Sequence, residues 1–432
     1  MNRRLTLLVL FTSIFAIGVL IWYFFFYTPK TAETLAKTTS PLEVRTTPPL
    51  FGFITNYFTD GQPQQTTSTE VTPAEEQALT QVWDKPSTGN VFVSIPTINE
   101  ITSTSSKIIK GKATEVVTKK NVRATSTVLM FVDRTTGYVY GHSMETGITY
   151  QISNTTITGV YDAYIFNNGK RILVRNLDSN GETIITTLAN IPSIKENDNP
   201  LPLSSVIALP NNIKSVAVSS SYDKLSYLIA SNGGSSVYTI TSKGTSLTAV
   251  SSFSEWVLSY GGEQLYATSK PSAYVDGSTV LLPSFTRIIG NKTGLLSNPS
   301  SNGTIINSMW SQTGLTTFLF SNGGTFSILP IKTVASKCSW NNNLILLICA
   351  APLSIPRTTE GLPDDWYQGR ISFSDELSFV NPKNGEIYPL YSFDSKLGGF
   401  DVVNLKVSLD NIYVSFINKV TGSVWLLKTD LI

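Results

Sequence analysis

The feature that most constrains how this chain folds is a phrase that recurs from about residue 90 to the C-terminus. A short strand-like stretch leads into a polar turn that ends in glycine, and a second stretch then opens with apolar or aromatic residues. The recurrences are VLMFVDRTTGYVYGHS, YLIASNGGSSVYTI, FLFSNGGTFSILPI, LSFVNPKNGEIYPL and VSFINKVTGSVWLLKT. Other strand–turn–strand stretches, such as IKSVAVSSSYDKLSYLIA, tend to precede it. Together the two phrases predict a four-stranded antiparallel blade.

The spacing of the glycine turns favours an all-β propeller. The turns recur at roughly 30 to 55 residues, which is typical of propeller blades. We expect about seven blades, within a range of six to eight. The predicted units lie near 127–153, 158–190, 213–249, 252–286, 303–331, 334–390 and 399–430. Closure needs an early strand beside the last one, and Gly89–Pro96 is the predicted strand. A β-solenoid and two stacked sandwiches remain alternatives.

The first residues predict a membrane location. Leu5–Tyr27 carries no charge, and as a helix of about 34 Å it would cross a bilayer core of roughly 30 Å. Cations directly precede this run, which predicts a cytoplasmic N-terminus (1–4), an anchor (5–27) and an extracytoplasmic remainder. A cleaved signal peptide is the alternative, but the run is long and no small-residue cleavage site follows it. The residues that flank the predicted anchor are Arg3, Arg4, Trp22, Tyr23 and Tyr27.

A tether and a short helix are predicted between the anchor and the blades. Residues 28–70 are rich in Thr, Pro, Gln and Ser, and such a segment stays disordered because it buries too little apolar surface. Within it, Phe51–Phe58 is an apolar island that we interpret as a strand packed on the later domain. A docking peptide or a membrane contact is the alternative. Thr72 and Glu75 form a capping box, so a helix is predicted within 71–88, running to about Trp83. The propeller then spans 89–432.

Composition argues against several classes of partner and site. A net charge of +2 argues against nucleic acid, because a phosphate-binding domain needs a basic face. One histidine, His142, and two cysteines are too few for a zinc, haem c or iron–sulfur site. His142 is predicted to be a surface or strand-end residue. Cys338 and Cys349 are a disulfide candidate. A hairpin centred on Asn342 would set Cys338 opposite Leu346, so the bridge needs a wider loop or a bulge.

Several stretches of the predicted blades are distinctive. VYTI, VSSSYDKLSYL and TGSVWLL resemble blades of WD-like, Tol-type periplasmic and quinoprotein-type propellers. Three longer stretches resemble a group of uncharacterised, membrane-anchored bacterial proteins with propeller-like domains. They are ALTQVWDKPSTG (78–89), the stretch from FVDRTTGYVYGHS to VRNLD (131–178) and the stretch from KCSWNNN to LSFV (337–380). The resemblance implies a propeller at the cell envelope and implies no activity.

The densest polar cluster lies between Pro363 and Glu376. Acids beside aromatic rings suit a sugar ligand, or calcium bound through three of the carboxylates. The calcium-loop pattern D-x-D-x-D-G is absent, and a loop whose rings plug a blade and whose acids are solvated is the alternative. The candidate ligand-binding residues are Asp364, Asp365, Trp366, Tyr367 and Asp375.

Recognised catalytic motifs are missing from the sequence. It contains no G-x-S-x-G elbow, P-loop, dinucleotide fingerprint or H-E-x-x-H motif. We therefore predict a non-enzymatic binding or scaffold module for an envelope protein or a glycan, held at the membrane by one helix. The alternative is an exported carboxylate-dependent glycosidase or lyase that uses the acidic loop 364–376.

Overall fold

The computed structural model describes residues 79–109, 112–219, 221–321, 323–341 and 347–429, and of 96–124 only the backbone. These residues belong to one compact unit, Pro63–Ile432. The predicted anchor, the tether with Phe51–Phe58 and the capping box lie outside the described residues. Within the described part of the chain, no helix combines the length and the hydropathy needed to cross a bilayer.

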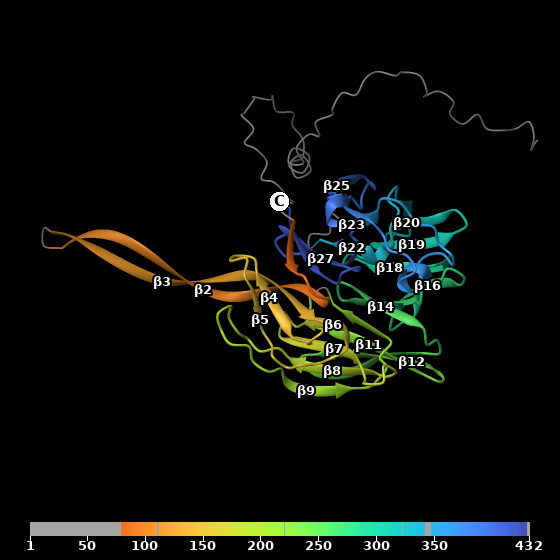
Figure 1. The fold of residues 1–432 in the computed structure, drawn as a ribbon, viewed down its shortest axis with the longest axis horizontal. Helices are drawn as coiled ribbons and strands as arrows, with labels where there is room; N and C mark the ends of the chain where they lie inside the picture. Colours follow the sequence, from red (N-terminus) through yellow and green to blue (C-terminus); the bar gives the residue numbers. More distant parts are fainter. Residues whose placement is uncertain (1–78, 110–111, 220, 322, 342–346, 430–432) are drawn as a thin grey trace, which may run out of the picture. The chain divides into compact units, whose positions relative to one another are not determined.

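The described strands form seven antiparallel sheets of four strands each, which appear in chain order from orange to blue in Figure 1. Blade 1 contains β2 (Ser87–Ile109), β3 (Lys112–Asp133), β4 (Val139–Ser143) and β5 (Thr149–Gln151). Blade 2 contains β6 (Val160–Phe166), β7 (Arg171–Leu177), β8 (Ile184–Asn190) and β9 (Ser204–Leu209). Blade 3 contains β10 (Ser215–Val218), β11 (Leu225–Ser231), β12 (Gly234–Thr241) and β13 (Gly244–Ser251). Blade 4 contains β14 (Trp256–Gly261), β15 (Gln264–Ser269), β16 (Asp276–Leu282) and β17 (Thr286–Thr293). Blade 5 contains β18 (Leu296–Pro299), β19 (Ile305–Ser311), β20 (Gly314–Phe320) and β21 (Phe326–Ile328). Blade 6 contains β22 (Cys338–Trp340), β23 (Leu347–Pro352), β24 (Asp375–Val380) and β25 (Ile387–Tyr391). Blade 7 contains β26 (Val402–Val407), β27 (Tyr413–Asn418), β28 (Val424–Lys428) and β1 (Leu79–Trp83).

The fold is therefore an all-β propeller, and the predicted count of about seven four-stranded blades is confirmed. The first strands of neighbouring blades contact one another, as β2 does with β6 and β26. The predicted units were incomplete in three places. They lacked β9 of blade 2 and β18 of blade 5, and they did not assign β2 to blade 1. Among the described residues, three short helical segments connect strands: η1 (Ala335–Lys337), α3 (Asp364–Tyr367) and η2 (Ser395–Leu397).

The prediction for the closing strand was wrong. Leu79–Trp83, predicted as the end of a helix, is the strand β1, which pairs with β28 and completes blade 7. Gly89–Pro96, predicted to pair with the last strand, lies in β2, which pairs with β3 in blade 1. The physical reason is that β28 would otherwise present an unpaired edge, and hydrogen bonding to that edge outweighs the weak helix preference of a short segment.

The glycine turns of the recurring phrase have the conformation that the phrase requires. Gly137 and Gly422 have φ of 76° and 75°, and their N–H groups donate to Asp133 O and Asn418 O at 2.8 and 2.7 Å. A Cβ atom at Gly422 would lie 2.7 Å from Pro86 Cα, so a larger residue clashes as well as being strained. Positive φ values also occur at Gly234, Gly324 and Gly385, so backbone strain favours glycine in the other recurrences too.

The hydrophobic core lies between neighbouring blades, and strand alternation explains it. In β3, Val128, Met130 and Val132 pack into a cluster shared with blade 2. The intervening Leu129 and Phe131 pack into a cluster shared with blade 7. Because successive side chains of a strand point to opposite faces, each blade supplies apolar residues to both neighbours. Strands buried on both faces therefore read as continuous apolar runs such as VLMFV.

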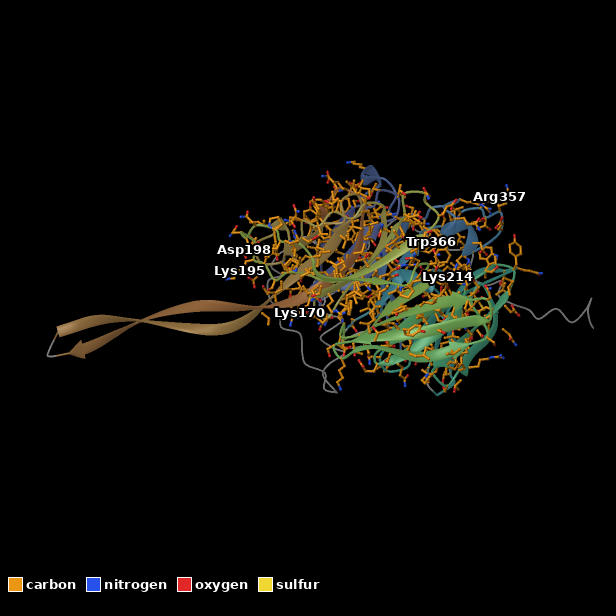
Figure 2. All side chains as sticks on the ribbon, turned by 90° about the horizontal axis from the view of Figure 1, so that it is seen from below. Lys170, Lys195, Asp198, Lys214, Arg357 and Trp366 are labelled. Atoms are coloured by element: carbon orange, nitrogen blue, oxygen red, sulfur yellow. A yellow bond between two sulfur atoms is a disulfide. The ribbon has the colours of Figure 1, made fainter. Side chains whose placement is uncertain are left out.

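Blade 1 also carries a long two-stranded extension. The pairing of β2 with β3 continues from Ile95↔Ser126 to Ile109↔Lys112, whereas β4 pairs only with Val128–Val132 of β3. Figures 1 and 2 both show the two strands leaving the blades as a ribbon. We call residues 96–125 the hairpin arm.

Candidate functional site

The first part of the predicted acidic cluster is folded into blade 6. Asp365 in α3 is completely buried, and its Oδ2 accepts the backbone N–H groups of Thr359 and Glu360 at 2.6 and 2.9 Å. Its Oδ1 accepts a hydrogen bond from Arg370 at 3.1 Å. The backbone N–H of Gly361 also donates to Oδ2, at 3.3 Å. Burial opposes the charge of Asp365, but the three backbone donors and the guanidinium hold its pKa below the ordinary value. Asp365 therefore holds the loop together.

Asp375 belongs to a buried ion cluster. Lys337 Nζ lies 2.5 Å from Asp375 Oδ2 and 2.6 Å from Asp401 Oδ1, and the three side chains have no exposed surface. Burial raises the pKa of Asp375 to about 6, although the charge of Lys337 opposes this rise. Trp366 donates its indole N–H to Asp401 Oδ2 at 2.9 Å. The sequence prediction contained Asp375 and Trp366 but neither Lys337 nor Asp401.

The five predicted residues do not form one ligand-facing surface. Trp366 is only 4% exposed, whereas Tyr367 is 52% exposed. Asp364 Oδ2 accepts the backbone N–H of Ala273, so this acid anchors a loop of blade 4. Among the described residues, no group of three or more His, Cys, Asp or Glu side chains is placed to hold a metal ion. The acids of this loop contact protein groups, which differs from the solvated or calcium-binding arrangements considered above.

The two cysteines form a disulfide. Cys338 in β22 lies directly opposite Cys349 in β23, with an S–S distance of 2.08 Å. The next pairs along the strands are Ser339↔Ile348 and Trp340↔Leu347. The connection between the strands is thus wider than a turn centred on Asn342, as the bridge requires.

His142 is a buried strand residue. It is the fourth residue of β4 and 7% exposed, and its Nδ1 lies 2.8 Å from Thr149 Oγ1. Burial lowers its pKa. The predicted strand-end position is close to the one observed, but the side chain does not lie on the surface.

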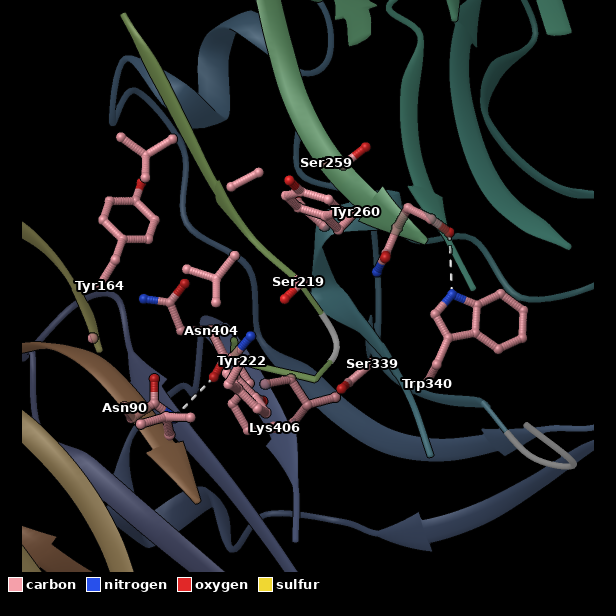
Figure 3. A pocket seen from close by; sticks show the side chains of 18 of the residues that line it. Asn90, Tyr164, Ser219, Tyr222, Ser259, Tyr260, Ser339, Trp340, Asn404 and Lys406 are labelled. Atoms are coloured by element: carbon pink, nitrogen blue, oxygen red, sulfur yellow. Dashed lines mark hydrogen bonds between the residues drawn. The ribbon is translucent and has the colours of Figure 1, made fainter. Parts of the chain in front are cut away.

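A channel between the first strands of the blades is the site that sequence reasoning missed. It has a volume of about 430 Å³ and is lined by residues of β2, β6, β10, β14, β18, β22 and β26, one strand from each blade. Figure 3 shows side chains from several of these strands around the space. The volume falls within the range of small-molecule pockets, roughly 300–1,000 Å³.

Lys406 supplies the channel with a cation. It comes from β26 of blade 7, lines the channel and is half-buried. Burial lowers its pKa. No carboxylate in the described part of the chain forms an ion pair with it. The other charged residue of the lining, Asp162, instead accepts hydrogen bonds from Tyr164 at 2.6 Å and Arg175 at 3.2 Å.

Aromatic, hydroxyl and amide groups make up much of the remaining lining. Tyr222 and Tyr260 are half-buried, and burial raises the pKa of Tyr222 to about 12, so its phenol stays neutral. The Tyr260 hydroxyl lies 2.7 Å from Ser226 Oγ. Trp340 donates its indole N–H to Asn298 O at 3.1 Å, which fixes its ring at the channel (Figure 3).

Two polar atoms of the lining residues lack a protein partner. Asn90 donates through Nδ2 to Asn404 O at 2.9 Å and to Ser415 Oγ at 3.0 Å, but its buried Oδ1 accepts no hydrogen bond from the described residues. The buried Oγ of Ser259 is likewise unpartnered within the described chain. Both atoms have almost no exposed surface, and buried polar atoms are normally hydrogen-bonded, so an internal water molecule is the partner that each requires.

The channel could not be recognised as a motif because its residues are contributed singly by different blades. Asn90, Asn298 and Asn404 lie far apart in the sequence and meet only when the ring closes. The available signal was a polar residue within the first strand of a blade, where an apolar residue would otherwise pack. To use that signal, one must know which strand is the first of each blade, and the repeated phrases identify this strand for only some of the blades.

Comparison with known proteins shows likeness to propeller structures. No protein-family model and no curated protein matches the chain. Hydrazine synthase of Kuenenia stuttgartiensis is 11% identical over 63% of this chain and 77% of its own, with a TM-score of 0.44. An oligogalacturonate lyase in complex with manganese is 10% identical over 78% and 97%, with a TM-score of 0.44. The β-propeller domain of Cps50 (Swd1) from Myceliophteria thermophila is 10% identical over 69% and 92%, with a TM-score of 0.40. Likeness at this level concerns the fold alone, and the chain is a seven-bladed propeller by its own strand pairing.

Proposed function

We propose that this protein is a binding module that holds a short acidic glycan in its central channel and catalyses no reaction on it. The observation that carries the proposal is Lys406, a channel lysine without an ion pair to any described carboxylate, surrounded by hydroxyl, amide and aromatic groups. A cation in a partly desolvated channel favours an anionic ligand.

The remaining lining suits the hydroxyl-rich part of such a ligand. Sugar rings present apolar C–H faces that stack on aromatic side chains, here Tyr222, Tyr260 and Trp340. Sugar hydroxyl groups donate and accept hydrogen bonds, which suits a lining that contains serine, asparagine and tyrosine side chains. The glycan carboxylate would pair with Lys406 at the same time.

The proposed location is the outer side of a cell membrane. Leu5–Tyr27 would serve as the anchor, with Arg3 and Arg4 in the cytoplasm. A channel that binds glycan is consistent with a place in the cell envelope. Protease added to intact cells should then release the blades by cutting within residues 28–70, and complete protection would contradict this topology.

The structure offers less support for the alternative, a carboxylate-dependent glycosidase or lyase. A glycosidase needs two carboxylates that face the substrate, and a carboxylate-dependent lyase needs at least one as the base. In the predicted loop, Asp365 is bound to backbone N–H groups and Asp375 to Lys337. In the channel, Asp162 is held by Tyr164 and Arg175. We therefore favour binding.

The test is retention of glycans by the full-length, detergent-solubilised protein on an array of neutral and acidic oligosaccharides. Lys406→Met should weaken retention of acidic members on the order of tenfold or more, because the ligand carboxylate loses its partner. Lys243→Met is the matched control, since Lys243 is exposed in the turn between β12 and β13. No retention of any acidic glycan, or equal retention by both variants, would contradict the proposal.

The hairpin arm favours a second role, docking to an acidic envelope protein. A two-stranded ribbon is marginally stable by itself, so a partner would stabilise it. The arm's sequence has six cations against two acids, a net charge of +4, compared with +2 for the whole chain. Replacing residues 97–124 by a short turn should abolish cross-linking to that protein in cells and leave glycan retention intact. Unchanged cross-linking would refute this role.

A further inference from the structure

The ion cluster at the junction of blades 6 and 7 has an arrangement that goes beyond a salt bridge. Lys337 ends η1, Asp375 begins β24, and Asp401 directly precedes β26. All three side chains are fully buried. Lys337 Nζ donates to Asp375 Oδ2 at 2.5 Å, to Asp401 Oδ1 at 2.6 Å and to Val402 O at 2.9 Å. These three hydrogen bonds use every N–H of the ammonium group and fix the nitrogen between the carboxyl groups.

Two aromatic rings and one further cation, Lys419, surround the cluster, and Lys419 Nζ lies 4.4 Å from the ring centroid of Trp366. Lys337 Nζ lies 5.1 Å from the ring centroid of Trp366 and 4.9 Å from that of Phe373. These two aromatic side chains are 4% and 3% exposed. Charges buried in such a site are costly, and a reaction that replaces them by neutral groups is correspondingly favoured.

We propose that Lys337 and Asp375 become joined by an amide bond between their side chains, formed by the protein itself with Asp401 as the proton acceptor. The reacting atoms are already in place. With Nζ 2.5 Å from Oδ2, the attached Cγ lies at a near-attack distance of roughly 3–3.5 Å. The cross-link would tie the start of blade 6 to its third strand.

The two carboxyl groups are held differently, which assigns their roles. Asp401 accepts hydrogen bonds from Lys337, from the Trp366 indole and from the Phe373 backbone at 3.2 Å. Asp401 Oδ1 lies 2.6 Å from Lys337 Nζ, so this carboxylate is within direct reach of an ammonium proton. Asp375 accepts from Lys337 and from Val402 N at 2.7 Å through Oδ2, whereas its buried Oδ1 has no partner among the described residues.

Asp375 is accordingly the electrophile. Burial raises its pKa to about 6, so the neutral acid is accessible near neutral pH. Protonation on the unpartnered Oδ1 makes Oδ2 the carbonyl oxygen. The backbone N–H of Val402 donates to Oδ2 and therefore stabilises the negative charge that develops there during attack.

The step balances without an oxidant or a co-reactant. Asp401 takes one proton from the Lys337 ammonium, and the nitrogen lone pair attacks Cγ of protonated Asp375. The C–Oδ1 bond then breaks, and Oδ1 leaves as water after taking a proton from the nitrogen. The products are a secondary amide, one water molecule and protonated Asp401. The net charge of the three groups is zero before and after, and no atom is oxidised or reduced.

The test is intact-mass measurement of the purified full-length protein after reduction of its disulfide. The expected mass is lower than the sequence mass by one water molecule, and Lys337→Met should show no such deficit. Trypsin should fail to cut after Lys337 and should yield a branched peptide in which Thr333–Arg357 is joined to Ile371–Lys383. A full sequence mass with normal cleavage after Lys337 would overturn the proposal. A branch to the peptide that contains Asp401 would also overturn it.

The role of Asp401 needs its own variant. Asp401→Asn should fold, as judged by circular dichroism, and lose the mass deficit, because no group then takes the proton. Asp133→Asn is the matched control at another buried carboxylate and should keep the deficit. If Asp401→Asn fails to fold, Asp401→Glu, which retains a proton acceptor, replaces it and should form the cross-link at a measurable rate. A deficit that survives in folded Asp401→Asn, or is absent from folded Asp401→Glu, contradicts the assigned role.

Discussion

Substitution of Trp83 tests how the ring of blades is closed. Trp83 is the last residue of β1, which belongs to blade 7, yet its ring packs on blade 1. Its centroid lies 4.3 Å from that of Tyr140 and 5.7 Å from that of Phe131. Its indole N–H donates to Asp133 Oδ2 at 3.2 Å. One side chain therefore links the first and last blades.

The expected loss of stability follows from these contacts. A half-buried tryptophan removes roughly 120 Å² of apolar surface from water, which is worth about 3 kcal/mol. The hydrogen bond to Asp133 adds about 1 kcal/mol. We expect Trp83→Ala to lower the free energy of unfolding by about 3–4 kcal/mol. Trp83→Phe keeps part of the ring packing and should lower it by about 1–2 kcal/mol.

Urea unfolding followed by circular dichroism measures this difference, provided that the slope of the transition stays constant. Thr80→Ala is the matched control, because Thr80 is exposed in the same strand and its backbone pairing with Leu426 is unaffected. Equal midpoints for Trp83→Ala and Thr80→Ala would refute the reasoning. The contacts between the Trp83 side chain and blade 1 would then not contribute to stability.

Three further predictions concern buried groups. Burial lowers the pKa of His142 in the folded state. The contribution of neutral His142 to the free energy of unfolding is therefore complete above pH 6.5, the unfolded pKa, and is lost as the pH falls through the lower folded-state pKa. An NMR titration of the folded protein that gives His142 a pKa at or above 6.5 would contradict this. Replacing Cys338 and Cys349 together by serine should lower the free energy of unfolding by about 3 kcal/mol, and an unchanged urea midpoint would show that the bridge adds nothing. Asp365→Asn should lower the thermal midpoint because three backbone N–H donors lose their charged acceptor. Glu360→Gln, at a partly exposed carboxylate, should not lower it, and equal midpoints for the two variants would argue against this role of Asp365.

Much of the fold was predictable because blade formation is a local and repeated event. Each glycine turn brings together strands that are neighbours in sequence, as Gly137 does for β3 and β4. The closing strand was not predictable in this way, because Leu79–Trp83 pairs with Val424–Leu427 at the other end of the chain. Strand β18, which contains Pro299, lacked the aromatic signal that marked other strands.

The site was harder to predict because its chemistry depends on contacts that composition does not encode. The acids near α3 were visible as a cluster, but the backbone donors of Asp365 were not. In the sequence, Lys337 is an isolated lysine beside Cys338, and nothing around it predicts a role. The fold places it between Asp375 and Asp401. Lys406 likewise became a candidate only when the first strands of the blades surrounded it.

The most direct test of the central claim is a structure of the full-length protein bound to an acidic oligosaccharide that it retains. We expect density for the sugar in the central channel, with its carboxylate beside Lys406 and a ring stacked on Tyr222, Tyr260 or Trp340. Density on the outer face of a blade or on the hairpin arm, with the channel holding only water, would contradict it.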